Sequence, residues 1–171
     1  MPWPRQGFFW KVLLGFAVIV IALAIVISNV LKGLDTKDDS TFRTVHIAEE
    51  TFAHTYPEIG YARNLTVLGD GRPPCTPSHA CLLDNVLACP EGTRAGWCSR
   101  GGYRYNVQSN SNRPPYKDYW LTATPIERDP KLKNYCMGSD GRVRVGGSQP
   151  LKGPYTLEEC LALPIDPTRA N

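Results

Sequence analysis

Six cysteines are the residues best suited to covalent chemistry in this 171-residue sequence: Cys75, Cys81, Cys89, Cys98, Cys136 and Cys160. They are even in number and lie among Pro and Gly residues, a pattern typical of disulfides formed in an oxidising compartment. Six cysteines allow 15 pairings. We favour Cys75 with Cys81 and Cys89 with Cys98 because these pairs close short loops. A short helix would also bring Cys160 to Cys136.

A zinc site is the competing interpretation, because His79 precedes Cys81 by two residues. Five, seven and eight residues separate the first four cysteines, and no C-x-x-C pair or C-x-x-C-H haem motif is present. Structural zinc sites usually have closer ligand spacing. His46 and His54 would lie about 80° apart around a helix, so we expect ordinary surface or rim residues. The sequence therefore predicts no metal and no cofactor.

The usual catalytic motifs are absent from the sequence. It has no G-x-S-x-G, H-E-x-x-H or Walker loop. Gly69-Asp70-Gly71 is followed by prolines and so does not fit a dinucleotide fingerprint. Asp84, Asp118 and Asp140 stand among turn residues, where Asp is favoured for backbone reasons. We therefore expect a protein that is not an enzyme.

The net charge of +3 comes from cations beside one apolar segment. From Gly33 onward, acidic and basic residues are equal in number, which gives no support to general nucleic-acid binding. The part from Gly33 to Glu91 is acidic and the part from Gly92 to Asn171 is basic. These halves could pack on each other, or the basic half could face a polyanion.

The segment Val12 to Leu31 contains no charged residue. As a helix it would be roughly 30 Å long, which is the thickness of a bilayer's hydrocarbon core. Because all the cysteines follow it, we place the N-terminus in the cytoplasm and the rest outside. The predicted organisation is a cytoplasmic leader-like segment 1–11, a transmembrane helix 12–31, a polar linker 32–40, an extracytoplasmic domain 41–163 and a flexible tail 164–171.

An amphipathic helix is predicted from Thr41 to Tyr56, ending at Pro57. Its apolar residues recur at helical spacing, and we expect Glu49 and Glu50 to point outward. A second, short helical piece is predicted from Ala80 to Ala88.

Three segments have the composition of strands in an antiparallel meander: Tyr103 to Gln108, Tyr119 to Thr124 and Arg142 to Val145. Their alternation places Tyr103 and Tyr105 on one face and an exposed Arg104 on the other. Thr156 and Glu159 have capping-box spacing before a short C-terminal helix.

A series of short motifs runs in a fixed order from Arg5 to about residue 145. It includes Arg5-Gln6-Gly7-Phe8, Ile27-Ser28-Asn29-Val30-Leu31-Lys32, Phe42-Arg43-Thr44-Val45, Thr55-Tyr56-Pro57, Gly60-Tyr61 and Ala80-Cys81-Leu82-Leu83-Asp84. In this order the motifs resemble those of type IV pilins and type II secretion pseudopilins. The first resembles a prepilin leader, with Gly7 and Phe8 as the candidate processing site.

The resemblance implies an α+β fold in which a long N-terminal transmembrane helix continues into an amphipathic helix packed on an antiparallel β-meander, with disulfide-stapled loops. It implies a non-enzymatic minor or accessory subunit of a type IV pilus or type II secretion pseudopilus. The expected partners are other pilin-like subunits or machinery proteins. The expected location is a bacterial inner membrane, with the main domain periplasmic or extracellular.

The sequence departs from the pilin pattern at one chemically important position. Prepilins have a glutamate as the fifth residue after the cleaved glycine, whereas this chain has Val12, preceded by Lys11. That glutamate neutralises the terminal amine of a neighbouring subunit within the membrane. The alternative is therefore an uncleaved single-pass protein whose outer domain binds a periplasmic partner.

Overall fold

The computed structural model describes residues 20, 40–69, 73–89 and 96–169. The chain divides into two compact units, Met1–Asp38 and Asp39–Asn171, and only Val20 of the first unit is described. Gly7, Phe8, the leader-like segment 1–11 and nearly all of segments 12–31 and 32–40 lie outside the described residues. Within the described residues, no helix combines the length and the apolar character that crossing a membrane requires.

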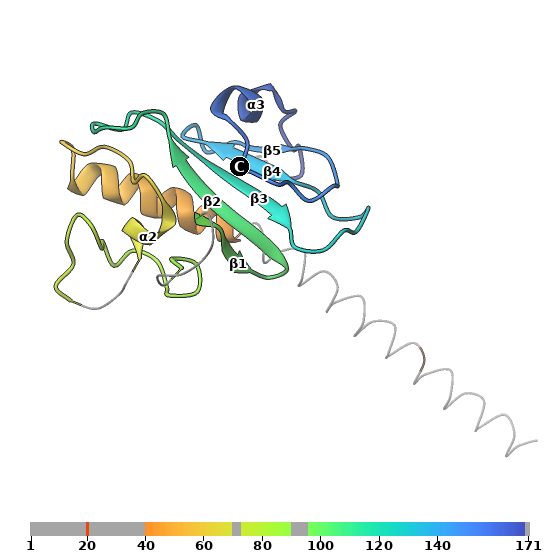
Figure 1. The fold of residues 1–171 in the computed structure, drawn as a ribbon, viewed down its shortest axis with the longest axis horizontal. Helices are drawn as coiled ribbons and strands as arrows, with labels where there is room; N and C mark the ends of the chain where they lie inside the picture. Colours follow the sequence, from red (N-terminus) through yellow and green to blue (C-terminus); the bar gives the residue numbers. More distant parts are fainter. Residues whose placement is uncertain (1–19, 21–39, 70–72, 90–95, 170–171) are drawn as a thin grey trace, which may run out of the picture. The chain divides into compact units, whose positions relative to one another are not determined.

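The described part of the second unit contains one antiparallel sheet of five strands in the order β1-β2-β3-β4-β5 (Figure 1). The strands are β1 (Cys98–Arg100), β2 (Tyr103–Ser109), β3 (Tyr119–Pro125), β4 (Tyr135–Gly138) and β5 (Val143–Val145). Each strand pairs with the next one along the chain. The sheet is therefore a meander in which β3 lies at the centre.

One face of the sheet is covered by the helix of residues 40–55, drawn in orange in Figure 1. Phe42, Val45 and Phe52 lie along one stripe of this helix, and each is at most 2% exposed. They join a core that includes Leu121 and Ala123 of β3. Residues 40–55 thus form a helix because helical geometry gathers their apolar side chains into one stripe, which is buried against the sheet.

The other face is covered by the C-terminal segment, which includes α3 (Leu157–Ala162). Trp120 of β3, Cys136 of β4 and Cys160 of α3 form a second buried cluster here. The side chain of Thr156 caps α3, and Glu159 completes a capping box. Residues 164–166, where the sequence predicts a flexible tail, instead pair with β5.

The segment from Ala80 to Ala88, predicted as helical, forms turns instead. Its amides bond outside the segment: those of Leu82 and Leu83 both donate to the carbonyl of Leu68, at the end of α2 (Leu65–Leu68). Cys81 and Cys89 have positive φ angles, which are incompatible with a regular helix. Contacts with α2 therefore override the local helical preference.

The predicted fold class, a long transmembrane helix continuing into an amphipathic helix over a pilin-like meander, is contradicted. The described residues form a small five-stranded antiparallel sheet with few helices, and none of these helices is long and apolar. β1 and β4 were not among the three predicted strands. The C-terminal segment also covers the second face of the sheet, on which the predicted fold class places no element.

Arg104 shows the effect of covering the second face of the sheet. It lies opposite Tyr103 and Tyr105, as the alternation predicts, but it is half-buried rather than exposed. Its Nη2 donates to the carbonyl of Leu151 at 3.2 Å, and its guanidinium lies 5.4 Å from the ring centroid of Trp97.

Replacing Phe52 by Ala should lower the free energy of unfolding by about 3 kcal/mol, because the whole ring is removed from a core where it is 0% exposed. Urea unfolding of the purified protein would measure the loss. Ile47→Ala on the same helix is the control: Ile47 is 54% exposed, so its loss should stay within about 0.5 kcal/mol. Equal effects of the two substitutions would contradict the packing.

Candidate functional site

A cluster of titratable side chains lies where the helix 40–55 meets the sheet and the loop that follows the helix. Glu49 is 0% exposed, although the sequence analysis expected it to point outward. Its Oε2 accepts a hydrogen bond of 2.8 Å from the amide of Ala62. Its Oε1 has no hydrogen-bond partner among the described residues. Glu49 therefore ties the loop to the helix with one carboxylate oxygen.

Burial raises the pKa of Glu49 well above its ordinary value of 4.5. The hydrogen bond from Ala62 favours the charged form and opposes this effect, while the nearby charge of Glu50 adds to it. A carboxyl group removed from water is destabilised in its charged form. Glu49 therefore holds its proton to a higher pH than a carboxyl group in solvent.

The neighbouring Glu50 anchors the same loop from the solvent side. The hydroxyl of Tyr61 donates to Glu50 Oε1 at 3.0 Å. Burial, followed by this hydrogen bond, raises the pKa of Tyr61 to about 12. Its ring packs on that of Tyr119, with 4.9 Å between the centroids. Two consecutive glutamates thus fix one loop, one through its backbone and one through a side chain.

His46 links the helix to β3. Its Nδ1 and the hydroxyl of Tyr119 share a hydrogen bond of 2.6 Å. Burial, with a smaller contribution from the charge of Glu49, raises the pKa of Tyr119. A hydroxyl that keeps its proton can donate to Nδ1. His46, predicted to be an ordinary surface or rim residue, instead has a specific partner 73 positions away in the chain.

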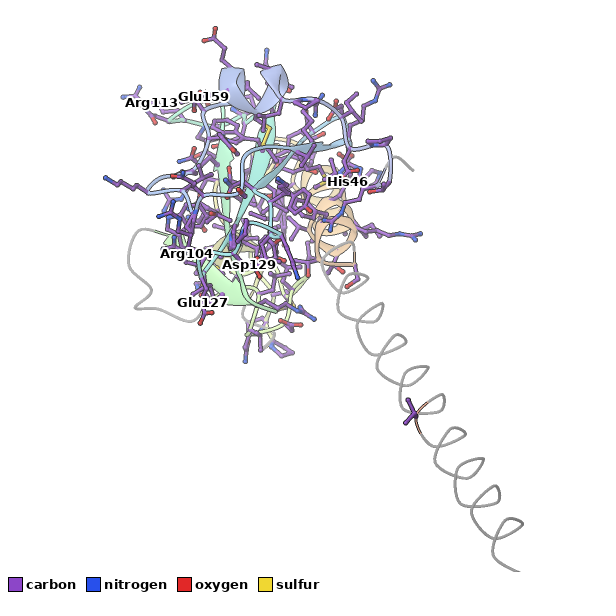
Figure 2. All side chains as sticks on the ribbon, turned by 90° about the vertical axis from the view of Figure 1, so that its right-hand side faces the viewer. His46, Arg104, Arg113, Glu127, Asp129 and Glu159 are labelled. Carbon is purple, nitrogen blue, oxygen red and sulfur yellow. A yellow bond between two sulfur atoms is a disulfide. The ribbon has the colours of Figure 1, made fainter. Side chains whose placement is uncertain are left out.

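His46 also lines a cavity of about 270 Å³ between the start of the helix and the ends of β4 and β5. Phe42, Met137 and Val143 provide apolar walls, and Arg43 and Arg169 provide positive charge. Gly141 has a φ of +70°, and a Cβ there would lie 3.0 Å from His46 Nε2. A larger residue would therefore strain the turn. Figure 2 labels His46 on the helix.

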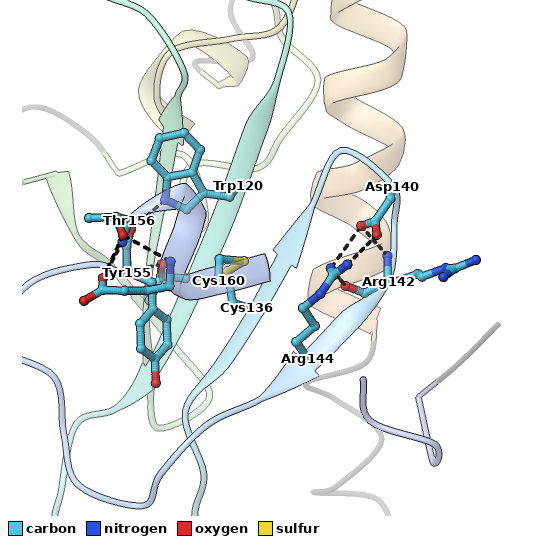
Figure 3. Close-up of a disulfide and its surroundings, with 10 residues drawn as sticks. Trp120, Cys136, Asp140, Arg142, Arg144, Tyr155, Thr156 and Cys160 are labelled. Carbon is cyan, nitrogen blue, oxygen red and sulfur yellow. Dashed lines mark hydrogen bonds and ion pairs between the residues drawn. A yellow bond between two sulfur atoms is a disulfide. The ribbon is translucent and has the colours of Figure 1, made fainter. Parts of the chain in front are cut away.

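A second group of polar contacts surrounds the disulfide on the opposite face (Figure 3). The indole Nε1 of Trp120 donates to the carbonyl of Tyr155 at 2.7 Å. At the nearby turn, Arg144 Nη2 lies 2.6 Å from Asp140 Oδ2. Hydrogen bonding to Arg144 holds the pKa of Asp140 below its ordinary range. The Trp120–Tyr155 bond fixes the C-terminal segment to β3, and the Arg144–Asp140 pair fixes the turn between β4 and β5.

The six cysteines form three separate disulfides: Cys75–Cys81, Cys89–Cys98 and Cys136–Cys160. These are the pairs that the sequence analysis favours. They are not gathered into one site, because they staple two loops and one helix in different places. In the described part of the chain, no three His, Cys, Asp or Glu side chains are grouped as metal ligands would be.

Sequence reasoning missed the Glu49–Ala62 and His46–Tyr119 contacts. For Glu49 a signal was present: it follows Val45 by four residues and precedes Phe52 by three, so it lies on the buried stripe. Its charge suggested exposure and masked that spacing. The partner of His46 is distant in the sequence and left no comparable signal.

Comparisons with known protein families, with curated proteins and with solved structures find no match to this chain.

The buried carboxyl group of Glu49 predicts a specific pH dependence. Because its pKa is higher in the folded than in the unfolded protein, the folded state binds more protons between the two values. Stability should therefore fall as pH rises from about 4.5 toward the raised pKa, and then level off. Glu49→Gln keeps an acceptor for Ala62 and should remove this fall, leaving the variant at least as stable as wild type at neutral pH.

Urea unfolding between pH 4.5 and 8 would test this expectation. The exposed Glu58 supplies the matched control, and Glu58→Gln should keep the wild-type slope. A Glu49→Gln variant with the same pH slope as wild type would show that Glu49 does not cause it.

Removing the disulfides should have unequal effects on stability. Cys136 and Cys160 are 24 positions apart, whereas Cys75 and Cys81 are only six apart. Loop-closure entropy predicts a loss of about 3 kcal/mol for the double change to Ala at Cys136 and Cys160, and about 2 kcal/mol at Cys75 and Cys81. Denaturant unfolding measures both, and the reverse order would contradict the argument.

Proposed function

We propose that this chain is an exported, membrane-anchored subunit that acts by binding other proteins and is not an enzyme. The observation that carries the proposal is the set of three disulfides, which all lie after the uncharged segment from Val12 to Leu31. Disulfides persist in oxidising compartments such as the periplasm or the cell surface. A single membrane pass with a cytoplasmic N-terminus would place all six cysteines there.

The machine we propose is a type IV pilus or a type II secretion pseudopilus of a bacterial inner membrane, in which the chain is a minor or accessory subunit. Support comes from the order of the short sequence motifs from Arg5 to about residue 145, including the leader-like Gly7-Phe8. It does not come from the fold class. The partners would be other pilin-like subunits or machinery proteins.

A second candidate is an uncleaved, tethered binding module of the periplasm. Two residues favour it: Lys11 puts a cation at the start of the apolar segment, and Val12 leaves no carboxylate to pair with a neighbouring terminal amine. An unpaired charge within a bilayer costs a few kcal/mol. Intact mass of the purified membrane protein distinguishes the two candidates, because only the first loses residues 1–7.

If the first candidate is correct, Val12→Glu should raise incorporation into sheared fibres by about tenfold or more, because a new carboxylate relieves the cost of the buried amine. Immunoblotting of sheared fibres against whole cells would measure the ratio. Gly7→Leu should block cleavage and abolish the gain, because no free mature terminus would form.

Two outcomes would overturn this scheme. Wild-type protein as abundant in fibres as a major pilin would remove the argument from the missing glutamate. Retention of residues 1–7, together with cross-links to periplasmic proteins alone, would establish the tethered module instead.

A further inference from the structure

The cavity of about 270 Å³ at the start of the helix 40–55 combines an apolar wall with hydrogen-bond donors. The wall is made of three buried side chains, those of Phe42, Met137 and Val143. The polar side chains of the described lining can all donate, and they are Ser40, Arg43, His46 and Arg169. No Asp or Glu is among the described lining residues. Ligand pockets usually enclose about 300 Å³ or more, so this cavity suits a small ligand.

The hydroxyl of Tyr119 determines which ring nitrogen of His46 can donate. Tyr119 is 0% exposed, and its hydroxyl lies 2.6 Å from the Nδ1 of His46, its hydrogen-bond partner. Burial raises the pKa of Tyr119, so the phenol keeps its proton. A buried hydroxyl hydrogen needs an acceptor, and Nδ1 is in place to be one. Nε2 therefore carries the ring hydrogen and is a donor.

The Nε2 atom of His46 lies beside Gly141, which lines the same cavity. A Cβ at Gly141 would be 3.0 Å from Nε2, and the absence of a side chain leaves that space open. Nε2 has no hydrogen-bond partner among the described residues. The histidine ring can therefore donate to a ligand without giving up its bond to Tyr119.

Arg43 is a second donor that the described structure leaves unused. It is exposed, and it makes no hydrogen bond or ion pair with other described residues. Arg43 precedes His46 by three positions on the helix, and side chains at this spacing are neighbours on a helix surface. A guanidinium and an imidazole N–H thus lie next to each other at the apolar wall.

Two aspartates near these lining residues in the sequence are already bound. Both carboxylate oxygens of Asp140 accept hydrogen bonds from Arg144, at 3.1 and 2.6 Å, as Figure 3 shows. Asp166 lies 3.8 Å from Arg169 and balances part of its charge. Neither aspartate belongs to the described lining. The guanidinium of Arg43 is therefore left to attract an anion from outside.

We propose that this cavity binds a phosphate group carried on a small apolar body, with Arg43 and His46 Nε2 donating to the phosphate oxygens. The apolar body packs on the wall that includes Phe42. A phosphate group has three or more acceptor oxygens, enough for the helix donors and for Arg169, whereas a carboxylate has two. A free organic phosphate and a lipid headgroup both carry this chemistry. The site uses residues 40–169 alone and does not depend on fibre entry.

The test titrates phenyl phosphate into the purified full chain and records the ring nitrogen signals of its three histidines by NMR. The His46 signals should shift and saturate at about 1 mM ligand. Those of His54 and His79, which lie outside the lining, should not shift. Arg43→Gln should weaken binding by about fivefold. The control, Arg128→Gln, changes an exposed cation outside the cavity and should leave the affinity unchanged.

Three further probes define the ligand. Inorganic phosphate lacks the apolar body and benzoate lacks the phosphate, so each should bind about fivefold more weakly than phenyl phosphate. Dihexanoyl phosphatidic acid, used below its micelle-forming concentration, separates the two sources: tighter binding than that of phenyl phosphate indicates a lipid headgroup, and weaker binding indicates a free organic phosphate.

Three results would overturn the proposal. The first is that neither phenyl phosphate nor phosphatidic acid shifts the His46 signals. The second is that benzoate binds as tightly as the better of these two phosphates. The third is that Arg43→Gln and Arg128→Gln change the affinity equally.

Discussion

The burial of one carboxyl group, that of Glu49, is the constraint that links the helix 40–55 to the loop after it. A carboxyl group on an apolar stripe is costly unless it is neutral or hydrogen-bonded. Here burial raises its pKa, and the amide of Ala62 donates to it. Because this bond fixes Ala62, a buried charge-bearing side chain of the helix holds the backbone of the loop that follows it.

The central strand, β3, shows how the C-terminal segment that covers the second face stabilises the sheet. Every residue of β3 is buried, because the helix covers one face and the C-terminal segment covers the other. The polar residues of the second face are satisfied by that segment: Thr122 accepts from the amide of Tyr155, and Thr124 accepts from the amide of Leu151. In a sheet covered on one side alone, these hydroxyls would face water. The Cys136–Cys160 disulfide keeps the covering segment in place.

The sequence predicts the elements with strong periodicity and misses those that depend on distant partners. The helix 40–55 and the strands β2, β3 and β5 lie within one or two residues of their predicted positions, because each has a clear apolar or β-branched pattern. β1 has three residues and β4 has four, and such short segments carry too little pattern to be recognised.

The fold class was wrong for a related reason. The short helix with Cys160 and its bond to Cys136 are predicted, but the hydrogen bonds by which residues 151–155 cover the second face join residues far apart in the chain, which no local pattern reports. The long apolar helix central to the expected architecture has no counterpart in the described residues. The short length of β1 has a local cause: Gly96, two residues before Cys98, has a φ of +72°, which does not continue a strand, and Cys98 is bonded to Cys89. β1 therefore begins at Cys98, beside its disulfide to Cys89, and pairs with residues 103–105 of β2.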